Sequence, residues 1–534
     1  MPLLLVDQPI AENVNFIVFL ATLTFSHVIL SQKQLSFEEG VNTVFKSFKP
    51  RAWAWAGLTA AMLIGGCSSG GGSNQSDDTR TTLKVMYYDE RAFFQSYGMI
   101  YSATHLNVDF EVISNQNVYQ DPNGDYTTNM KKLIDEQKPD ILMLDNNLLR
   151  EFSEEGKLLD LDTIAQDKSF KPDTLVPGLL EYLRDLGGGK LYGMSPNMYS
   201  QVIYYNKDLF DKHGVDLPRD AMSWDELFAL AKRFPTDGDK DSRVYGLSLG
   251  WNGADAYQLG SMIASTQNLS MINPVDMKVT LNTPAWKKSF ETAFDVVKSN
   301  ALHSQNMNEG MGTVFNYDDY LLQDPFVSGK VAMKMEAQYL MDQIDQAQKS
   351  PTVKDKAVKE WGIVTMPVDP ANPDRSPYVN LNNLFAVSAK SENSDAAKEF
   401  LAYVMGEDFA RVSSKAQMGG MPVRTTAYED KEGRNLKAFY MLKPMESSMN
   451  NLYTKLPMNF YGILDGTVRG AVQSAFDGNK SLDDALKEAE TQLQAELIKS
   501  QEEEKNKTAS SDASASPAAA ESASVSVSAE AVAQ

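Results

Sequence analysis

Cysteine, histidine and clustered basic residues are scarce in this chain, and each scarcity excludes a class of protein. A single cysteine, Cys67, stands among 534 residues, so no disulfide can form within the chain and no zinc site can use two cysteines. Only four histidines are present, and no nucleophile elbow accompanies them. The formal net charge of −21 disfavours nucleic acid as a partner, because neutralising phosphates requires clustered lysine and arginine.

Apolar residues, by contrast, are plentiful enough to build large cores. They make up 43% of the chain, and aromatic residues make up 10%. A chain of this length is expected to fold into more than one domain. The acidic balance indicates a soluble, self-repelling surface and does not identify a ligand.

The segment before Cys67 has the features of an export signal. Three basic residues, Lys46, Lys49 and Arg51, precede an apolar stretch at 52–66 that is too short to span a bilayer. Its end resembles the lipobox of bacterial lipoproteins, in which an aliphatic residue and two small residues precede the cysteine that receives a lipid. Export also accounts for the lack of any other cysteine, since an unpaired thiol could oxidise wrongly outside the cell.

These features predict the processing and location of the protein. We interpret residues 44–66 as a lipoprotein signal peptide, Cys67 as the lipidation site and the polar stretch at 67–82 as a flexible tether. The mature protein would then be lipid-anchored at the extracytoplasmic face of a bacterial cell membrane.

Residues 1–43 do not fit this scheme, because Val14 to Leu30 is a second apolar run of about membrane-spanning length. We interpret them as an upstream extension, with the true start at a GTG codon for Val44. A real membrane span is the alternative, and the nucleotide sequence of the gene distinguishes the two.

From Leu83 onward, strand and helix patterns alternate. Strands are predicted at 83–88, 108–113 and 141–144, and helices at 91–105, 126–137 and 148–155. This order predicts a mostly parallel α/β sheet, in which ligands bind beyond the carboxyl ends of the strands. Candidate ligand contacts at these ends are Tyr88, Asp145 and Asn146. For Asp145 and Asn146, capping of the following helix is an equal alternative.

A polar and aromatic segment at 195–201 precedes a strand-like run at 202–205 and a helix start at Asn206. We interpret the segment as the entrance to a crossover between two lobes. Within it, Tyr199 is the leading candidate for a ligand contact.

Several segments, taken in order, resemble family 1 extracellular solute-binding proteins, the sugar-type receptors of ABC importers. They are Leu191 to Gly193, Tyr204 to Phe210, Ser223 to Leu227, Phe326 to Met333, Trp361 to Pro367, Phe385 to Ser391 and Asp395 to Leu401. The resemblance extends over Leu83 to Glu496. It implies an α/β fold of the type II periplasmic-binding-protein kind, with two lobes joined by hinge crossovers that close around a ligand in the cleft.

With this resemblance, the chain divides into discontinuous lobes. We expect an N-terminal lobe from 83–200 and 380–420, and a C-terminal lobe from 201–379 and 421–500. An amphipathic helix is predicted over Ser481 to Ile498. The tail at 501–534 contains few large apolar residues and is expected to stay disordered.

The resemblance also suggests further ligand contacts. A ligand-stacking aromatic in the turn after the strand at 326–333 falls on Tyr339, and Glu336 in the same turn can add hydrogen bonds. Asn382, in an asparagine-rich segment, either lines the cleft or forms a hinge turn. Trp251 stands between glycines, where it either stacks on a sugar or packs at a strand end.

One acidic stretch, Asp237 to Asp241, resembles the start of a calcium loop. Such a loop requires glycine at its sixth position and glutamate at its twelfth, where this chain has Ser242 and Ser248. The pattern therefore favours a solvated acidic turn.

These features together favour a lipid-anchored substrate-binding protein that captures a carbohydrate and delivers it to the permease subunits of an ABC importer. We expect a monomer without cofactor, metal or catalytic activity. A cationic ligand such as a polyamine stays open, with Asp89, Glu90, Asp145, Asp255 and Glu336 as candidate contacts. Iron ligation by adjacent tyrosine pairs is disfavoured because neighbours on a strand face opposite ways. A secreted glycosidase needs two carboxylates at a fixed separation, and no sequence signature marks such a pair.

Overall fold

The computed structural model describes part of the chain from Arg80 onward. The candidate signal peptide, the apolar run from Val14 to Leu30, and the residues Cys67, Trp251 and Asn382 lie outside the described residues. Among the helices that are described, none combines the length and the apolar content needed to cross a membrane. The described residues are 80–120, 126–239, 243–250, 255–304, 316–381, 383–416, 420–428, 433–447, 452, 456–457 and 459–514.

The first sheet has the spatial order β11-β3-β1-β2. β1, β2 and β3 run parallel, and β11 is antiparallel to β3. The strands span Thr81–Tyr87 (β1), Val108–Ser114 (β2), Ile141–Leu144 (β3) and Leu384–Val387 (β11). Every residue of β3 is buried, in agreement with its continuous apolar sequence. The predicted mostly parallel sheet is confirmed.

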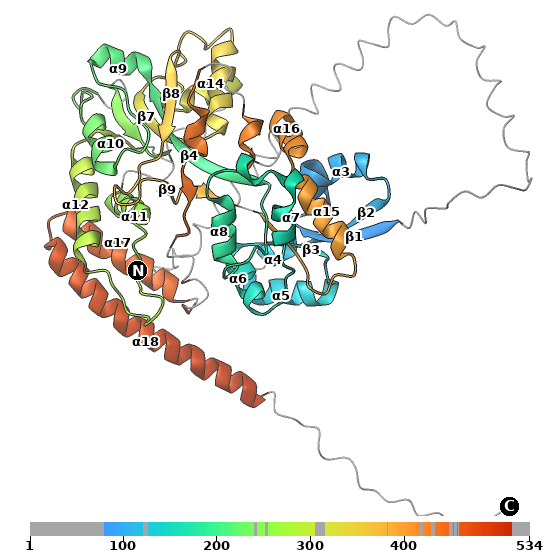
Figure 1. Cartoon of the computed structure of the whole chain (residues 1–534). Coiled ribbons are helices and arrows are strands. Elements are labelled where there is room, and N and C mark those ends of the chain that lie inside the picture. The colour runs from blue at the N-terminus through green and yellow to red at the C-terminus, as the bar shows by residue number, and fades with distance from the viewer. Residues whose placement is uncertain are drawn as a thin grey trace, which may run out of the picture. The chain divides into compact units, whose positions relative to one another are not determined.

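Helices flank this sheet and connect its strands (Figure 1). They are α2 (Glu90–Phe93), α3 (Met99–Thr104), α4 (Gln116–Gln120), α5 (Tyr126–Gln137), α6 (Asn146–Glu154), α7 (Asp162–Gln166), α8 (Leu179–Leu186), α15 (Ser394–Val404) and α16 (Glu407–Ala416). The helices predicted at 126–137 and 148–155 are confirmed. The one predicted at 91–105 is divided, because a π-helical turn at Phe94–Gly98 separates α2 from α3.

The second sheet is organised around the long strand β4, Asn197–Asn206. β4 pairs antiparallel with β7, β8, β10 and β12, whereas β5 is parallel to β6 and β7. These strands are β5 (Tyr245–Ser248), β6 (Leu302–His303), β7 (Val331–Ala337), β8 (Trp361–Thr365), β10 (Val379–Asn380) and β12 (Met421–Pro422). A separate pair, β9 (Arg375–Ser376) and β13 (Lys443–Pro444), runs parallel.

β4 begins earlier than its sequence predicts. We expected a strand only at 202–205, preceded by a polar entrance, but 197–200 already belong to the strand and to the second sheet, upstream of the predicted lobe boundary at 201. The early start of β4 results from pairing with strands that are distant in the sequence. Asn197 and Met198 pair with β12, and Tyr199 and Ser200 pair with β10. Polar side chains do not prevent this, since the backbone supplies the ladder of hydrogen bonds.

The helices around the second sheet end in a long C-terminal hairpin (Figure 1). They are α9 (Lys207–His213), α10 (Trp224–Ala231), α11 (Ala256–Thr266), α12 (Pro284–Lys298), α13 (Tyr317–Gln323), α14 (Tyr339–Lys349), α17 (Phe460–Phe476) and α18 (Leu482–Ser514). α18 packs on α17 through buried leucines and valines, including Leu486, Leu493 and Val468.

α18 also corrects the expected start of the disordered tail. The helix continues to Ser514, beyond residue 501, where we placed the start of unstructured chain. Its continuation, from Gln501 to Lys507, consists mainly of glutamate and lysine. Such residues have high helix propensity and extend an existing helix without needing to bury apolar surface.

The start of α10 shows a capping box of the predicted kind. The Ser223 hydroxyl accepts a hydrogen bond from the Glu226 backbone N–H at 3.2 Å, and the Glu226 carboxylate accepts one from the Ser223 backbone N–H at 2.8 Å. The cap places Trp224 in the core, 4% exposed.

Removing this cap should have a measurable cost. We expect Ser223→Ala to lower the free energy of unfolding by about 1 kcal/mol, because one helix N–H loses its acceptor. Urea denaturation measures the loss. Ser414→Ala in α16 is the control, since its hydroxyl donates to the Arg411 carbonyl of its own helix and caps no helix N–H among the described residues. Equal stability of the two variants would show that the box contributes nothing.

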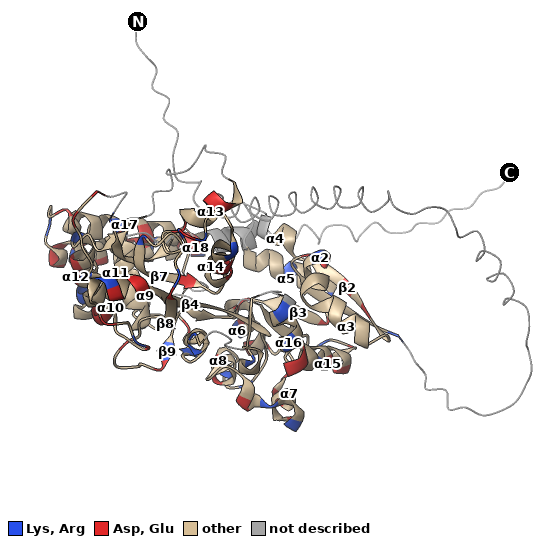
Figure 2. Ribbon diagram, turned by 90° about the horizontal axis from the view of Figure 1, so that it is seen from above, with Lys and Arg blue, Asp and Glu red and all other residues tan. Residues whose placement is uncertain are grey.

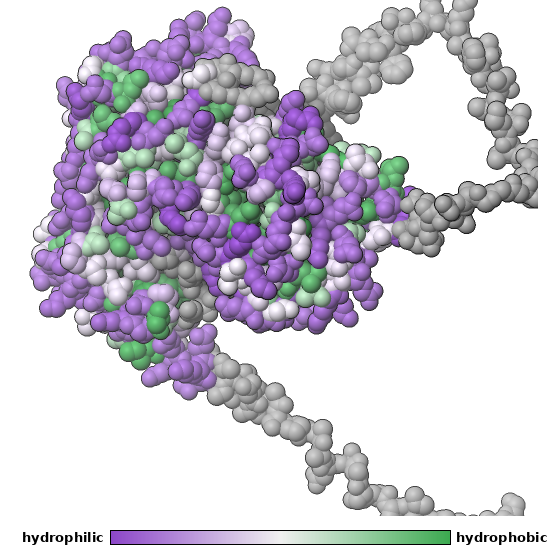
Figure 3. Space-filling model, in the orientation of Figure 1, coloured by the Kyte–Doolittle hydropathy of each residue, from purple (hydrophilic) through white to green (hydrophobic). Residues whose placement is uncertain are grey.

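The outer surface is mixed in charge and largely polar. Figure 2 shows lysine and arginine scattered among aspartate and glutamate over the helices. The face drawn in Figure 3 is mostly hydrophilic, with small, separated apolar areas.

Candidate functional site

At the carboxyl ends of the first sheet, the predicted contacts have partners within the protein. Asp145 caps α6, because one carboxylate oxygen accepts hydrogen bonds from the backbone N–H groups of Asn147 and Leu148, both at 2.9 Å. Asn146 donates its side-chain N–H to the Tyr182 hydroxyl at 2.9 Å. Of the two roles predicted for Asp145, ligand contact or helix cap, the structure shows the helix cap.

Tyr88 lies directly after β1 and is half-buried, whereas its neighbour Tyr87 is 7% exposed and stacks on Phe385 in the core. The Tyr88 hydroxyl accepts a hydrogen bond from the Gln116 side-chain amide at 3.4 Å. This alternation agrees with the prediction that one tyrosine of the pair faces the core.

Asn115, at the end of β2, is a candidate that the sequence analysis missed. Its side chain is fully buried, and neither its amide nitrogen nor its oxygen has a hydrogen-bond partner among the described residues. Leaving such a group unsatisfied costs about 1–3 kcal/mol, so a ligand or water that pairs with it stabilises the site. In the sequence, Asn115 is a polar residue directly after a strand of alternating pattern, at the same sheet edge as Tyr88. That pattern could have identified it as a candidate contact.

A buried ionic triad joins two residues of β7 in the second sheet to Asp324 at the end of α13. The Lys334 ammonium contacts the Glu336 carboxylate at 3.2 Å and also pairs with Asp324. The side chains of Lys334, Glu336 and Asp324 are 5%, 8% and 15% exposed. Burial alone would lower the pKa of Lys334, but the carboxylates of Asp324 and Glu336 outweigh it and raise that pKa.

Two tyrosines from different elements share the neighbourhood of Glu336. Tyr199 is half-buried on β4, and Tyr339 begins α14 with 42% of its surface exposed. Burial raises the pKa of both hydroxyls, and the negative charge of Glu336 raises both further. The structure therefore brings together three of the predicted residues, Tyr199, Glu336 and Tyr339.

The local structure around Glu336 differs from the prediction. We expected it in a turn, but β7 continues to Ala337 because Gln201 on β4 pairs with Ala337. Glu336 thus has the fixed position of a strand residue, and Tyr339 follows at a helix start.

The chain after β5 approaches the same carboxylate. Gly250 has a φ of +62°, and a Cβ at this position would lie 3.7 Å from a Glu336 oxygen. Glycine suits this left-handed conformation and keeps the backbone close. Since Ser248 of β5 pairs in parallel with Lys334, the carboxyl ends of β5 and β7 meet here.

Further along the same chain, α11 borders a cavity of about 290 Å³ that reaches α12 and α17. The lining is aromatic and polar, and includes Tyr257, Ser261, Trp286, Tyr461 and Asp465. The Tyr257 hydroxyl donates to the Asp465 carboxylate at 2.8 Å, and the Arg469 guanidinium lies 4.5 Å from the Tyr257 ring centre.

Arg469 belongs to a second ionic group beside this cavity. It pairs with Asp255 at 3.3 Å and with Asp465 at 3.5 Å. Of these residues, only Asp255 was predicted from the sequence, as a candidate contact for a cationic ligand. The others lie on a helix far away in the sequence, so no local pattern marks them.

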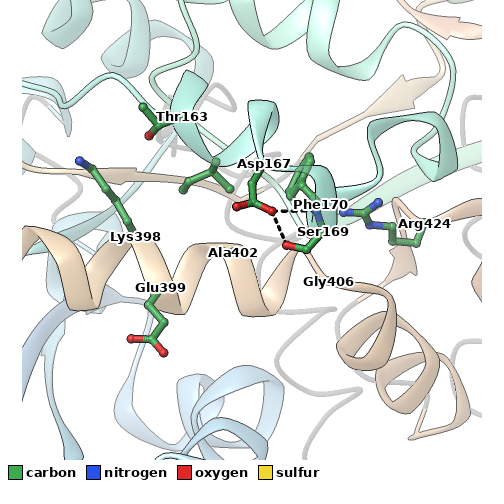
Figure 4. A pocket seen from close by; sticks show the side chains of 10 residues that line it. Thr163, Asp167, Ser169, Phe170, Lys398, Glu399, Ala402, Gly406 and Arg424 are labelled. Carbon is green, nitrogen blue, oxygen red and sulfur yellow. Dashed lines mark hydrogen bonds between the residues drawn. The ribbon is translucent and has the colours of Figure 1, made fainter.

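A larger cavity of about 340 Å³ lies elsewhere, between α7 and α15 (Figure 4), and contains none of the predicted contacts. Arg424 borders it with its guanidinium 4.6 Å from the Phe170 ring centre. This guanidinium donates hydrogen bonds to the backbone carbonyls of Met405 and Lys171. These bonds within the protein compensate for the burial of the Arg424 charge. Within the described part of the chain, no group of three or more His, Cys, Asp or Glu is placed to hold a metal ion.

Comparisons with known proteins agree on one family. A sequence model described as bacterial extracellular solute-binding protein matches residues 81–410. The sn-glycerol-3-phosphate-binding periplasmic protein UgpB of Rhizobium meliloti is 22% identical over 355 residues, covering 64% of this chain and 77% of that protein.

Two solved structures show the same fold. A sugar transporter from Rhizobium etli in an open conformation has a TM-score of 0.52 at 23% identity, covering 78% of this chain and 99% of that chain. The sugar-binding protein MalE of Xanthomonas citri has a TM-score of 0.56 at 15% identity, covering 78% and 98%. These likenesses confirm the predicted two-lobed α/β fold of the periplasmic-binding-protein type.

Proposed function

Because this chain belongs to the bacterial extracellular solute-binding protein family, we propose that it captures a saccharide outside the cytoplasm and delivers it to the membrane subunits of an ABC importer. The observation that carries the proposal is the grouping of Tyr199, Glu336 and Tyr339 at the ends of β4 and β7. Tyrosine rings stack on the C–H faces of sugars, and a buried carboxylate accepts hydrogen bonds from sugar hydroxyls. The protein binds and releases its solute and catalyses no reaction.

Other polar groups extend this site. Ser200, beside Tyr199, is 1% exposed, and its hydroxyl has no hydrogen-bond partner among the described residues. Gly250 lies beside Glu336 at the same edge of the second sheet. On the other lobe, Tyr88, Asn115 and Asn146 supply polar groups at the carboxyl ends of the first sheet, where ligands of α/β folds bind. Trp251 and Asn382, outside the described residues, are further candidate contacts on the sequence pattern alone.

The anchoring of the protein is a second part of the proposal. We propose that Cys67 carries the lipid, that the stretch from Cys67 to the start of β1 at Thr81 forms a tether shorter than the predicted 67–82, and that the monomeric protein stays on the outer face of the cell membrane. Labelling with a fatty-acid analogue should mark the protein, and Cys67→Ser should abolish both the label and membrane retention. A label retained in Cys67→Ser would place the lipid elsewhere.

Ligand screening tests the central function. We expect the melting temperature to rise, and calorimetry to report binding, for one or more members of a saccharide panel, with polyamines and metal ions as controls. Binding of a polyamine alone would replace the saccharide by a cationic ligand. Turnover of a glycoside substrate would instead establish an enzyme.

A further inference from the structure

The segment at 443–447 is held by the helices around the second sheet. Its strand β13 pairs in parallel with β9. Just after β9, the Tyr378 hydroxyl donates to the Met262 carbonyl of α11 at 3.3 Å. At the other end of the segment, Ser447 lines the cavity that α11, α12 and α17 border.

β9 and the same segment also contact the helices of the first sheet. The Arg150 guanidinium of α6 donates to the Glu446 carboxylate at 2.7 Å. β9 supplies a second pair, since Arg375 donates to the Glu181 carboxylate of α8 at 3.1 Å. Figure 1 shows α8 next to β9. Two ion pairs therefore connect helices of the first sheet with strands that are attached to the second.

The Arg150–Glu446 pair is the more buried of the two. Its side chains are 28% and 16% exposed, against 38% and 54% for Arg375 and Glu181. One oxygen of Glu446 is buried and has no hydrogen-bond partner among the described residues, so the carboxylate relies on Arg150. Water and salt screen such a pair less than an exposed one, and losing one partner leaves the other charge uncompensated.

This pair lies beside a candidate solute contact. Asn146 stands one turn before Arg150 on α6 and donates to the Tyr182 hydroxyl of α8 at 2.9 Å. Burial, with a smaller contribution from the negative charge of Glu446, raises the pKa of that hydroxyl to about 12. The pair is therefore near the carboxyl end of β3, on the side of the first sheet where a solute is expected.

We propose that Arg150 and Glu446 form a latch, which joins the two lobes at the rim of the cleft and holds them in the arrangement that binds the solute. The inference rests on the proposed function, because it concerns how the same cleft closes. Both are positioning residues, which act through the placement of the lobes. Opening of the lobes separates the pair, so the free energy of pairing adds to the affinity for the solute. The exposed pair of Arg375 and Glu181 contributes less.

Calorimetry with the sugar selected by screening tests the latch in the full-length protein. We expect Arg150→Met and Glu446→Gln each to weaken binding at least about fivefold. The double variant should bind no more weakly than the weaker single variant, because both substitutions remove the same pair. The control is Arg184→Met, which removes a pair of comparable exposure, with Asp162 at 2.7 Å, between two helices of the first sheet. It should bind the sugar as the unaltered protein does.

Unchanged affinity in both single variants overturns the latch. A double variant whose loss is the product of the two single losses, or an equal loss in Arg184→Met, overturns it as well. These results leave the proposed function intact, whereas an unaltered protein that binds no sugar contradicts the proposed function itself.

Small-angle scattering of the unliganded protein tests the latch independently of any sugar. The radius of gyration should be larger for Arg150→Met and Glu446→Gln than for the unaltered protein and for Arg184→Met, because the lobes open more often without the pair. Equal radii for all four proteins would overturn the latch.

Discussion

Replacing Lys334 with methionine should lower the free energy of unfolding by about 3 kcal/mol at pH 7, because it leaves two carboxylates buried together without their shared cation. Asp324 and Glu336 are 15% and 8% exposed, so neither can recover its hydration without moving β7. Urea denaturation measures the loss. The matched control is Lys349→Met on α14, where the lysine side chain is 74% exposed and its removal should cost less than about 1 kcal/mol.

The pH dependence of this loss identifies its cause. The difference in the free energy of unfolding between Lys334→Met and the unaltered protein should shrink as the pH rises above about 10, where Lys334 loses its charge. In the unaltered protein the pKa of Lys334 is raised, so its contribution is complete at neutral pH and is lost only as the pH rises through that raised value, above about 10. A difference that stays constant with pH would show that lost packing, not charge, explains the destabilisation.

Replacing Tyr199 with alanine should weaken saccharide binding by about 30-fold or more, equivalent to about 2 kcal/mol, while changing the melting temperature of the unliganded protein little. The ring is half-buried beside Glu336, and its strand is held by backbone pairing with Asn380, which the substitution leaves in place. Calorimetry with the sugar selected by screening measures the loss of affinity.

Tyr317→Ala is the control for this variant, because Tyr317 lies on α13 with 57% of its surface exposed. It should bind the sugar as the unaltered protein does. A large drop in the melting temperature of Tyr199→Ala would instead assign Tyr199 to the core, and equal losses of affinity in both variants would remove Tyr199 from the site.

The sequence correctly predicted the elements whose structure depends on residues near one another in the chain. The apolar run at 141–144 is a strand buried along its whole length, and the Ser223 to Glu226 spacing forms a capping box. The start of β4 was missed because its partners, at 379–380 and 421–422, are more than 170 residues away in the sequence. No pattern within 197–200 records those pairings.

The same distinction applies to the site. Glu336 and Tyr339 were predicted from a family resemblance and Tyr199 from its polar surroundings, and the structure places them together. Their ionic partners were not predicted, because Lys334 stands in an apolar strand sequence and its partner Asp324 lies ten residues earlier, outside that strand. Asp145 shows the opposite case, since a polar residue after a strand can be used entirely to cap the next helix.

A crystal structure of the protein with the saccharide selected by screening tests the central claim most directly. We expect sugar density at the ends of β4 and β7, with a ring against Tyr199 or Tyr339 and a hydroxyl within hydrogen-bonding distance of Glu336. Sugar bound only in the cavity between α7 and α15, or a cleaved glycoside in the site, would contradict it.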